Sequence, residues 1–328
     1  MSTVPTNANI TYFGKVPSRG DFVKSGSSLP LLNSLDNWLA RTMDSMSTDT
    51  RWKSIYDEVE PFHFAFLGPR SRLAIAGHFT ASCDAAQRRF PFVTAVAMDV
   101  DDSKAFAYRS PLALSRLWSR LSHLSANAAA AVDATSDLNA IAGSMVQVDI
   151  ESKAYDENFH IFLEQQTIGS LDSWLKDAGF EGNCRQLILG LGLLLQPVMA
   201  SGSNRLEKSL CLPLPIDPVY RSLTAAFWLA LINPFLQRAD FELSIFVTHS
   251  QQRPVLIVGF SGASSLTLEA VLSPKIAQEH FIRFDQAAWV EETVTSDYGV
   301  AKLSSYLEQP RLSLTSARQY FNEVFLGN

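Results

Sequence analysis

Hydrophobic and polar positions follow two different periods along this chain, and each period predicts one kind of element. Between Leu32 and Met46, leucine and methionine recur every three or four residues, which predicts an amphipathic helix with Trp38 near its apolar stripe. Short apolar runs bounded by turn residues predict strands instead. Three such runs are Phe62–Leu67, Leu73–Phe79 and Phe92–Met98. They alternate only partly, which favours central strands that are covered on both faces.

Turn residues indicate how these elements connect. Gly68–Arg72 contains a glycine and a proline between the first two strands, which favours a hairpin. After Pro111, leucines at helical spacing predict a further helix, and Asp133–Asp137 predicts a break before the next one. The second half repeats the mixed pattern. Its predicted helices are Thr167–Asp177, Tyr220–Leu236 and Tyr320–Leu326, and its predicted strands are Leu243–Val247 and Val255–Phe260, joined by a polar turn.

The alternation of helices and strands predicts an α/β fold. We expect a mixed β-sheet flanked by helices, a layered α/β sandwich, with a second helix-rich α/β portion that could pack on the same core. The chain has 328 residues, a length that suggests about two domains. We place the boundary near residues 145–155, which gives an amino-terminal domain over residues 1–150 and a carboxy-terminal α/β domain over residues 151–328.

Composition excludes several classes of partner and compartment. A net charge of −6 argues against nucleic acid, because phosphate binding needs a basic surface. Three scattered cysteines are too few for a disulfide framework, which favours reduced thiols. Residues 1–9 are polar, unlike a signal peptide, and the most apolar segments are shorter than the roughly 20 residues that span a bilayer. We therefore expect a cytoplasmic protein that does not insert into membranes.

One polar stretch, residues 14–22, has the composition of a loop held in one shape. It follows a β-type run and carries two glycines, which can adopt positive φ, and a proline, which fixes one φ between them. Phe13 and Phe22 would pin its two ends, and three charged side chains would project from it. Its candidate site residues are Gly14, Lys15, Pro17, Arg19, Gly20, Asp21 and Phe22.

These residues also carry a resemblance. The order Gly-Lys-x-Pro-x-Arg-Gly-Asp-Phe over residues 14–22 resembles the amino-terminal signature of the TagF (ImpM) family of type VI secretion accessory proteins. Two later segments are similar to further family motifs: residues 35–39 around Trp38, and residues 82–92, which contain Asp84, Arg88 and Pro91. Together the three motifs span roughly residues 10–100. Two positions depart from the family pattern, since Ala81 replaces a proline and Gln87 replaces a glycine.

The resemblance implies a function. A TagF-like protein is expected to be a bacterial, non-enzymatic, post-translational negative regulator of type VI secretion that binds a forkhead-associated scaffold protein. It implies no cofactor. Because both motif loops lie beside predicted strands, we expect them to meet at one end of the sheet, where Arg19, Asp21, Asp84 and Arg88 would converge into one polar cluster. Asp84 and Arg88 would mainly brace the loops while Lys15 and Arg19 face the partner. We also expect Gly20 to adopt a conformation that branched residues cannot.

A hydrolase is the alternative that the residues themselves leave open. Gly259–Ala263 follows a predicted strand and holds Ser261 where a nucleophile elbow would, although alanine stands at the closing glycine position. His280 is the histidine downstream of it, and that spacing is short for triad members that arrive from separate strands. A simple strand-to-helix turn explains the segment better. The six histidines show no paired metal-ligand spacing, so we expect no metal site.

Overall fold

A single nine-stranded sheet forms the centre of the computed structural model, which describes residues 6–26, 28–68, 72–150, 153–201, 206–236 and 242–327. The strand order is β11-β8-β10-β9-β4-β5-β6-β2-β3. Neighbouring strands are antiparallel except β8 and β11, which are parallel, so the sheet is mixed. The strands are β2 (Thr11–Gly14), β3 (Val23–Ser25), β4 (Phe62–Leu67), β5 (Leu73–Thr80), β6 (Phe92–Asp99), β8 (Ser209–Pro213), β9 (Leu243–Ser250), β10 (Arg253–Gly259) and β11 (Phe281–Arg283).

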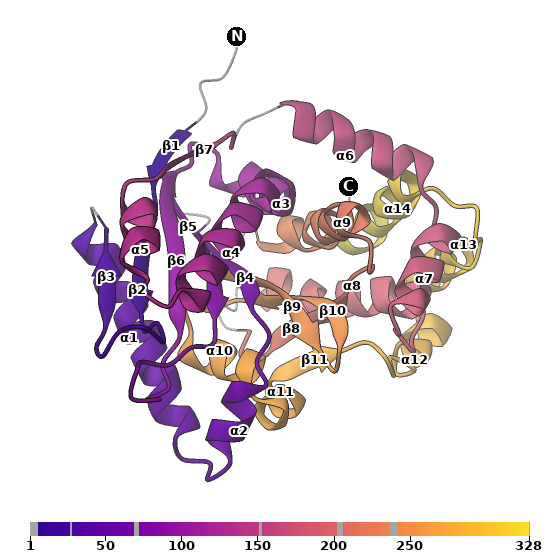
Figure 1. Ribbon diagram of the computed structural model, residues 1–328. Coiled ribbons are helices and arrows are strands. Elements are labelled where there is room, and N and C mark those ends of the chain that lie inside the picture. Colours follow the sequence, from indigo (N-terminus) through magenta and orange to yellow (C-terminus); the bar gives the residue numbers. More distant parts are fainter. Residues whose placement is uncertain are drawn as a thin grey trace.

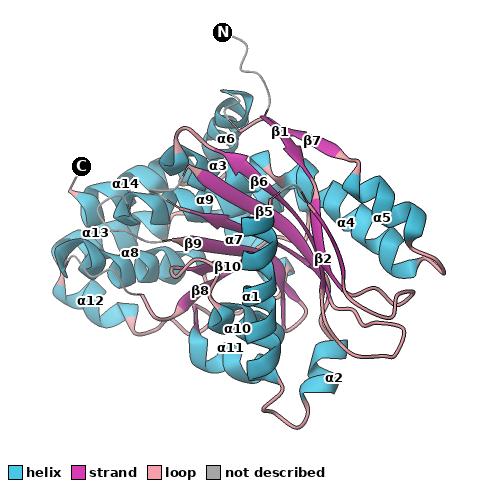
Figure 2. Ribbon diagram, turned by 90° about the vertical axis from the view of Figure 1, so that its left-hand side faces the viewer, coloured by secondary structure: helices cyan, strands magenta, loops and turns pink. Residues whose placement is uncertain are grey.

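Helices cover both faces of this sheet (Figures 1 and 2). The smaller layer consists of α1 (Leu29–Met46), α2 (Trp52–Asp57), α10 (Ser265–Leu272) and α11 (Pro274–His280). The larger layer consists of α3 (Ser103–Ala113), α4 (Ser115–Ala130), α5 (Thr135–Ala142), α6 (Lys153–Gln165), α7 (Ile168–Asp177), α8 (Cys184–Ser201), α9 (Pro218–Leu236), α12 (Val290–Ser296), α13 (Tyr298–Leu307) and α14 (Leu314–Leu326). The predicted α/β fold, with a mixed sheet between helical layers, is confirmed.

Alternating strand residues build two separate cores because successive side chains point to opposite faces of a sheet. In β4, Phe62 and Phe64 pack under α1, whereas Ala65 and Leu67 belong to the core on the other face. In β10, Ile257 and Leu256 divide in the same way. The central strands are therefore apolar on both faces, as their incomplete alternation predicted.

The two halves of the chain meet in the middle of the sheet. β4 pairs with β9 from His63↔Val247 to Leu67↔Leu243, so strands from both halves form one continuous sheet. Ahead of β2, the short strand β1 (Thr6–Asn9) pairs with β7 (Met145–Val148) in a separate ribbon. The second portion therefore packs on the same sheet as the first, and the division into residues 1–150 and 151–328 stays a prediction.

Most elements with a clear period appear where the sequence predicted them. The helix with the leucine and methionine stripe is α1, and β4 and β5 pair as a hairpin. Residues 69–71 of the predicted turn lie outside the described residues. The helix expected after Pro111 is in fact two helices, because Pro111 lies inside α3 and α4 begins at Ser115.

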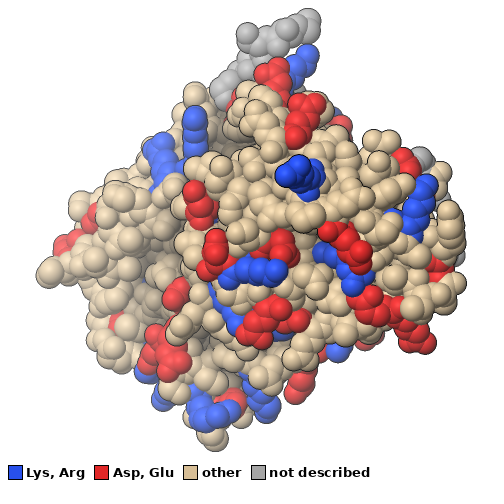
Figure 3. Space-filling model, turned by 90° about the vertical axis from the view of Figure 1, so that its right-hand side faces the viewer, with Lys and Arg blue, Asp and Glu red and all other residues tan. Residues whose placement is uncertain are grey.

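By length and composition alone the helix α9 could cross a membrane, with a mean hydropathy of 1.2 over 18 consecutive residues, but 61% of that stretch is buried inside the protein. This burial is typical of a core helix. On the face built around α7, α12 and α13, acidic and basic side chains lie side by side (Figure 3). Ion pairs in this region include Arg185 with Glu291 and Lys176 with Asp172.

Candidate functional site

The two predicted motif loops meet at one end of the sheet. The first loop connects β2 to β3, the second connects β5 to β6, and β2 lies beside β6. The N–H of Ala85 donates to the carbonyl of Arg19 at 2.8 Å, and the N–H of Lys15 donates to the carbonyl of Pro91 at 3.3 Å. The expected convergence of the two loops is therefore present.

A buried carboxylate joins the loops. Asp84 has no exposed surface, and its Oδ2 accepts hydrogen bonds from Lys15 Nζ at 2.9 Å and Arg88 Nε at 2.7 Å. Its Oδ1 accepts from the backbone N–H groups of Ala86 and Arg88. Burial alone raises the pKa of Asp84, but these N–H groups and the two cations outweigh burial and hold that pKa well below its ordinary value. Asp84 is thus an ionised structural centre of the site.

Lys15 corrects one expectation about roles. It was expected to face a partner, but the residue is only 7% exposed because its ammonium group is bound to Asp84 and lies 4.9 Å from the ring centroid of Phe22. Arg88 instead braces the loops and also reaches the surface. It binds Asp84 and donates from Nη2 to the Gly20 carbonyl at 2.8 Å, yet its side chain is 62% exposed. Lys15 braces the loops, and Arg88 is available at the surface.

We expected Gly20 to hold the backbone conformation that other residues avoid, but the glycine of the first loop that holds it is Gly14. Gly14 has φ +134°, and a Cβ added there would lie 1.9 Å from the Pro91 carbonyl oxygen. Gly20 has no atom within 4 Å of such a Cβ, and its φ lies outside the region that favours glycine. The close approach of β2 to β6, and not the tip of the loop, is what requires a glycine.

Three phenylalanines form the apolar base of the first loop. Phe22 stacks on Phe13 with ring centroids 5.7 Å apart and packs edge-on against Phe90 at 4.8 Å. Both ends of the loop are therefore pinned, as expected. Phe22 is nevertheless 45% exposed, so one face of its ring reaches solvent. Large exposed aromatic side chains are common contact residues in protein interfaces.

Comparison with known proteins supports the resemblance. The family model described as the TagF N-terminal domain, type VI secretion system-associated, matches residues 11–147. Residues 11–147 are a TagF N-terminal domain. This match indicates a type VI secretion system-associated protein, and it contains every candidate residue of both motif loops.

Other comparisons add little to this assignment. No curated protein matches the chain significantly. Among solved structures, one match is the protein PA0076 of Pseudomonas aeruginosa PAO1, with 20% sequence identity and a TM-score of 0.32. The match covers 41% of this chain and 62% of that protein. Similarity at this level carries no argument about function.

The surface of the TagF N-terminal domain around these loops includes one residue that the sequence marked only as a departure. Gln87 stands where the resemblance expects a glycine, and its φ is +60°, a conformation that glycine adopts without strain. A residue with a side chain therefore holds a backbone conformation here that glycine adopts more easily. Gln87 is exposed at the tip of the second loop, beside Arg88.

Arg19 extends this surface toward α5. Its Nη2 lies 3.1 Å from Asp133 Oδ1, it also donates to the Thr135 hydroxyl, and its side chain is 38% exposed. Pro17 and Asp21 are also exposed, and Asp21 Oδ1 accepts a hydrogen bond from the N–H of Phe22. The expected cluster of four charges is therefore wrong, because Asp21 binds within its own turn and Arg19 pairs with Asp133, while Asp84 is bound by Lys15 and Arg88.

Trp38 lies away from this surface, in the core between the two halves. It is 3% exposed and packs against Phe64, Phe66 and Phe246, and its indole N–H donates to the Ser264 carbonyl at 3.2 Å. Its place in the family motif is thus explained by packing between α1, the sheet and the segment before α10.

Within the described residues, no hydrogen bond joins Ser261 and His280, the two residues of the alternative hydrolase. Ser261 is exposed in the turn between β10 and α10, and this turn follows a strand and precedes a helix as predicted. His280 is buried at the end of α11, with Nε2 3.2 Å from Ser209 Oγ and 3.3 Å from Thr267 Oγ1. Burial lowers the pKa of His280. Within the described part of the chain, no group of three or more potential metal ligands gathers.

Proposed function

We propose that this protein is a non-enzymatic regulator of type VI secretion that binds a forkhead-associated scaffold protein in the bacterial cytoplasm. Binding to the scaffold would oppose assembly of the secretion apparatus after its components have been made. The domain match supports the secretion association, and the resemblance of the motif loops supports the regulatory role. Three free cysteines, two of them buried, agree with a reducing compartment.

The observation that carries this proposal is an exposed set of side chains on a rigid frame. Arg19, Phe22, Gln87 and Arg88 form what we call the motif-loop surface, and every one of them is at least partly exposed. Below them, Asp84 is buried and bound by two cations. Arginine and aromatic side chains dominate many binding interfaces, and a surface that is already ordered loses little conformational entropy on binding.

Charge indicates which partner surface would fit. Arg19 and Arg88 both present guanidinium groups that can bind carboxylates in a planar, two-point manner. Asp133 already binds Arg19 Nη2, and Arg88 Nη2 donates to the Gly20 carbonyl, but both side chains are partly exposed and reach solvent. We therefore expect the contacting surface of the scaffold protein to carry acidic side chains around an apolar pocket that receives Phe22.

Calorimetric titration of the purified scaffold protein into this protein tests the proposal. Arg19→Ala should weaken binding at least tenfold, because it removes a contact residue and, for folding, only an exposed ion pair with Asp133 and a hydrogen bond to Thr135. Arg72→Ala is the matched control. Arg72 also forms an exposed ion pair, with Asp101, and it lies at the opposite end of β5 from the motif loop. The control should bind like the natural protein.

A second variant removes a contact side chain without disturbing the fold of the loop. Gln87→Gly removes an exposed side chain at a position where glycine relaxes the backbone, so folding should be unchanged or slightly improved while binding weakens. If Arg19→Ala, Gln87→Gly and Phe22→Ala all bind normally, the interface is not the motif-loop surface. If the natural protein does not bind the scaffold, the proposed partner is wrong.

The absence of enzymatic activity is part of the proposal and has its own test. The bonds of His280 to Ser209 and Thr267 support it, because a general base for Ser261 would need to reach that hydroxyl. Purified protein should show no turnover of ester, phosphomonoester or nucleotide substrates. Turnover that disappears in Ser261→Ala would establish the hydrolase instead.

A further inference from the structure

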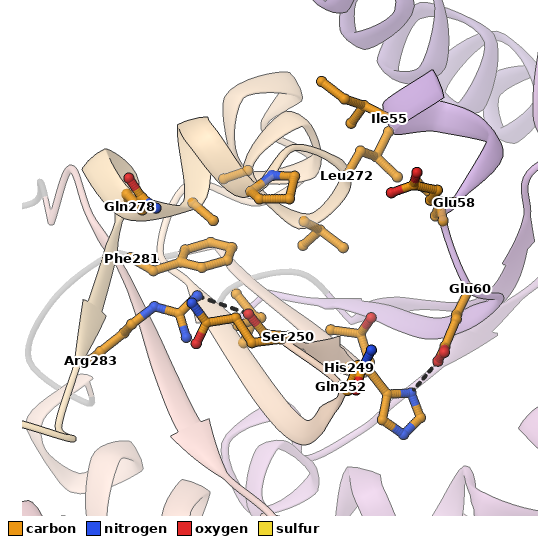
Figure 4. A pocket seen from close by; sticks show the side chains of 18 residues that line it. Ile55, Glu58, Glu60, His249, Ser250, Gln252, Leu272, Gln278, Phe281 and Arg283 are labelled. Atoms are coloured by element: carbon orange, nitrogen blue, oxygen red, sulfur yellow. Dashed lines mark hydrogen bonds and ion pairs between the residues drawn. The ribbon is translucent and has the colours of Figure 1, made fainter. Parts of the chain in front are cut away.

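A cavity of about 470 Å³ lies where the two halves of the chain meet, and neither motif loop lines it. One wall is the segment from α2 to β4, the opposite wall is α11 and β11, the end of α10 lies between these walls, and the β9–β10 hairpin closes the base (Figure 4). This size is within the range of small-molecule sites, and such sites often form where two parts of a protein meet.

Unpaired charges of opposite sign stand on opposite sides of this cavity. Figure 4 shows Glu58 and Glu60 on one side and Arg283 on the other. Glu60 binds His249 Nδ1 at 2.8 Å, and Arg283 Nη2 donates to Ser250 Oγ at 2.8 Å. Across the described ranges, neither Glu58 nor Arg283 forms an ion pair. Arg283 is half-buried, so a carboxylate that reached it would bind in a partly desolvated setting.

Apolar side chains form part of the wall between the charges. Leu272 lies on the side of Glu58, and Phe281 lies beside Arg283 (Figure 4). Ile257 and Ala277 also line the cavity, and all four of these residues are buried. These side chains can contact an aliphatic chain, while residues of the β9–β10 hairpin, among them Thr248 and Ser250, supply polar groups at the base of the same cavity.

The base of the cavity contains a strained turn. Gln251 and Gln252 have φ of +54° and +64°, and both line the cavity. A two-residue hairpin with both central φ values positive strongly favours Asn-Gly or Gly-Gly, which adopt this geometry with less strain. Two glutamines there keep amide groups at the cavity although the backbone is strained. Strain retained in this way is typical of ligand-binding positions.

From these four features we propose that the cavity binds a small amphoteric ligand, with a carboxylate at Arg283, a protonated amine or guanidinium at Glu58, and an aliphatic chain between them. Basic amino acids and the carboxyl-terminal ends of peptides that finish in lysine or arginine share this chemistry. This site is separate from the motif-loop surface, and the proposal does not depend on the scaffold protein.

Calorimetric titration with defined probes tests the site. L-arginine, L-lysine and 6-aminohexanoate carry both charges, whereas hexanoate and hexylamine carry one charge each. We expect at least one probe with both charges to bind at least tenfold more tightly than either probe with one charge. The tripeptide Gly-Gly-Arg distinguishes the source, since tighter binding than L-arginine indicates a peptide end and weaker binding indicates the free amino acid.

Two variants assign the charges. Glu58→Gln and Arg283→Met should each weaken binding of the best probe at least tenfold, while Glu207→Gln and Arg311→Met, at exposed positions outside the cavity, should not change it. Glu58 is exposed, so its variant folds even if Arg283→Met does not, and thermal melting checks both. The proposal is overturned if no probe binds at millimolar concentration, if one charge is sufficient, or if Glu58→Gln binds like the natural protein.

Discussion

Replacing Gly14 with alanine, and Gly20 with alanine as a matched control, tests how the motif loops are held. The two glycines lie six positions apart in the same loop region. Gly14 has φ +134°, and its added Cβ would lie 1.9 Å from the Pro91 carbonyl oxygen. Gly20 faces open space. The same chemical change therefore meets a steric block at one position and none at the other.

The magnitude follows from two costs at Gly14. Side-chain-bearing residues rarely adopt this backbone conformation, and such strain costs about 1–3 kcal/mol. Real Cβ atoms essentially never lie within 3.0 Å of such an atom, so β2 and β6 must also separate locally. Forced shifts of this kind cost about 1–3 kcal/mol more. We expect Gly14→Ala to lower the free energy of unfolding by about 2–6 kcal/mol, and Gly20→Ala to change it by less than about 0.5 kcal/mol.

Urea denaturation followed by circular dichroism measures both values, and thermal melting provides a second readout. For a chain of this size a loss of 1 kcal/mol lowers Tm by about 2 °C, so Gly14→Ala should melt several degrees below Gly20→Ala. Equal stability of the two variants would refute the argument from the Pro91 contact. A larger loss in Gly20→Ala would show that the tip of the loop is the constrained part.

Three further predictions concern buried polar groups. Lys15→Met should lower the free energy of unfolding, measured by urea denaturation, by about 3 kcal/mol, because Asp84 loses one of the two cations that bind its buried carboxylate. Unchanged stability would mean that Arg88 and the backbone N–H groups are enough to stabilise the Asp84 carboxylate. Stability should also fall as the pH decreases from about 6.5 to 4, because burial lowers the pKa of His63 to about 3 and that of His78 to about 4, so the unfolded chain takes up protons that the folded protein excludes. Replacing both histidines with glutamine should flatten this pH profile, and an unchanged slope would assign it to other groups. Trp38→Phe should cost about 1–2 kcal/mol in thermal or urea unfolding through the lost indole hydrogen bond and the smaller ring, and no loss would contradict its role between the halves.

The sequence by itself determined the features that depend on neighbouring residues. The spacing of leucine and methionine predicted α1, because a helix turns once in 3.6 residues and buries one face. The turn residues after Leu67 predicted the β4–β5 hairpin for a similar local reason. The sequence also predicted an ordered loop over residues 14–22, since proline and glycine determine the backbone conformations next to them and Phe13 and Phe22 are apolar residues at its two ends. The identity of the domain followed from the order of its motifs.

Only the tertiary structure decided the role of each residue in that loop. Gly14 is the constrained glycine because the Pro91 carbonyl, far along the chain, lies against it. Lys15 is buried because Asp84 receives it, and Arg19 reaches Asp133 in a segment that the sequence connects to neither motif. A charged side chain in a loop has the same local pattern whether it braces the fold or faces solvent. Its partner decides which, and that partner is found only when strands from distant parts of the chain pair.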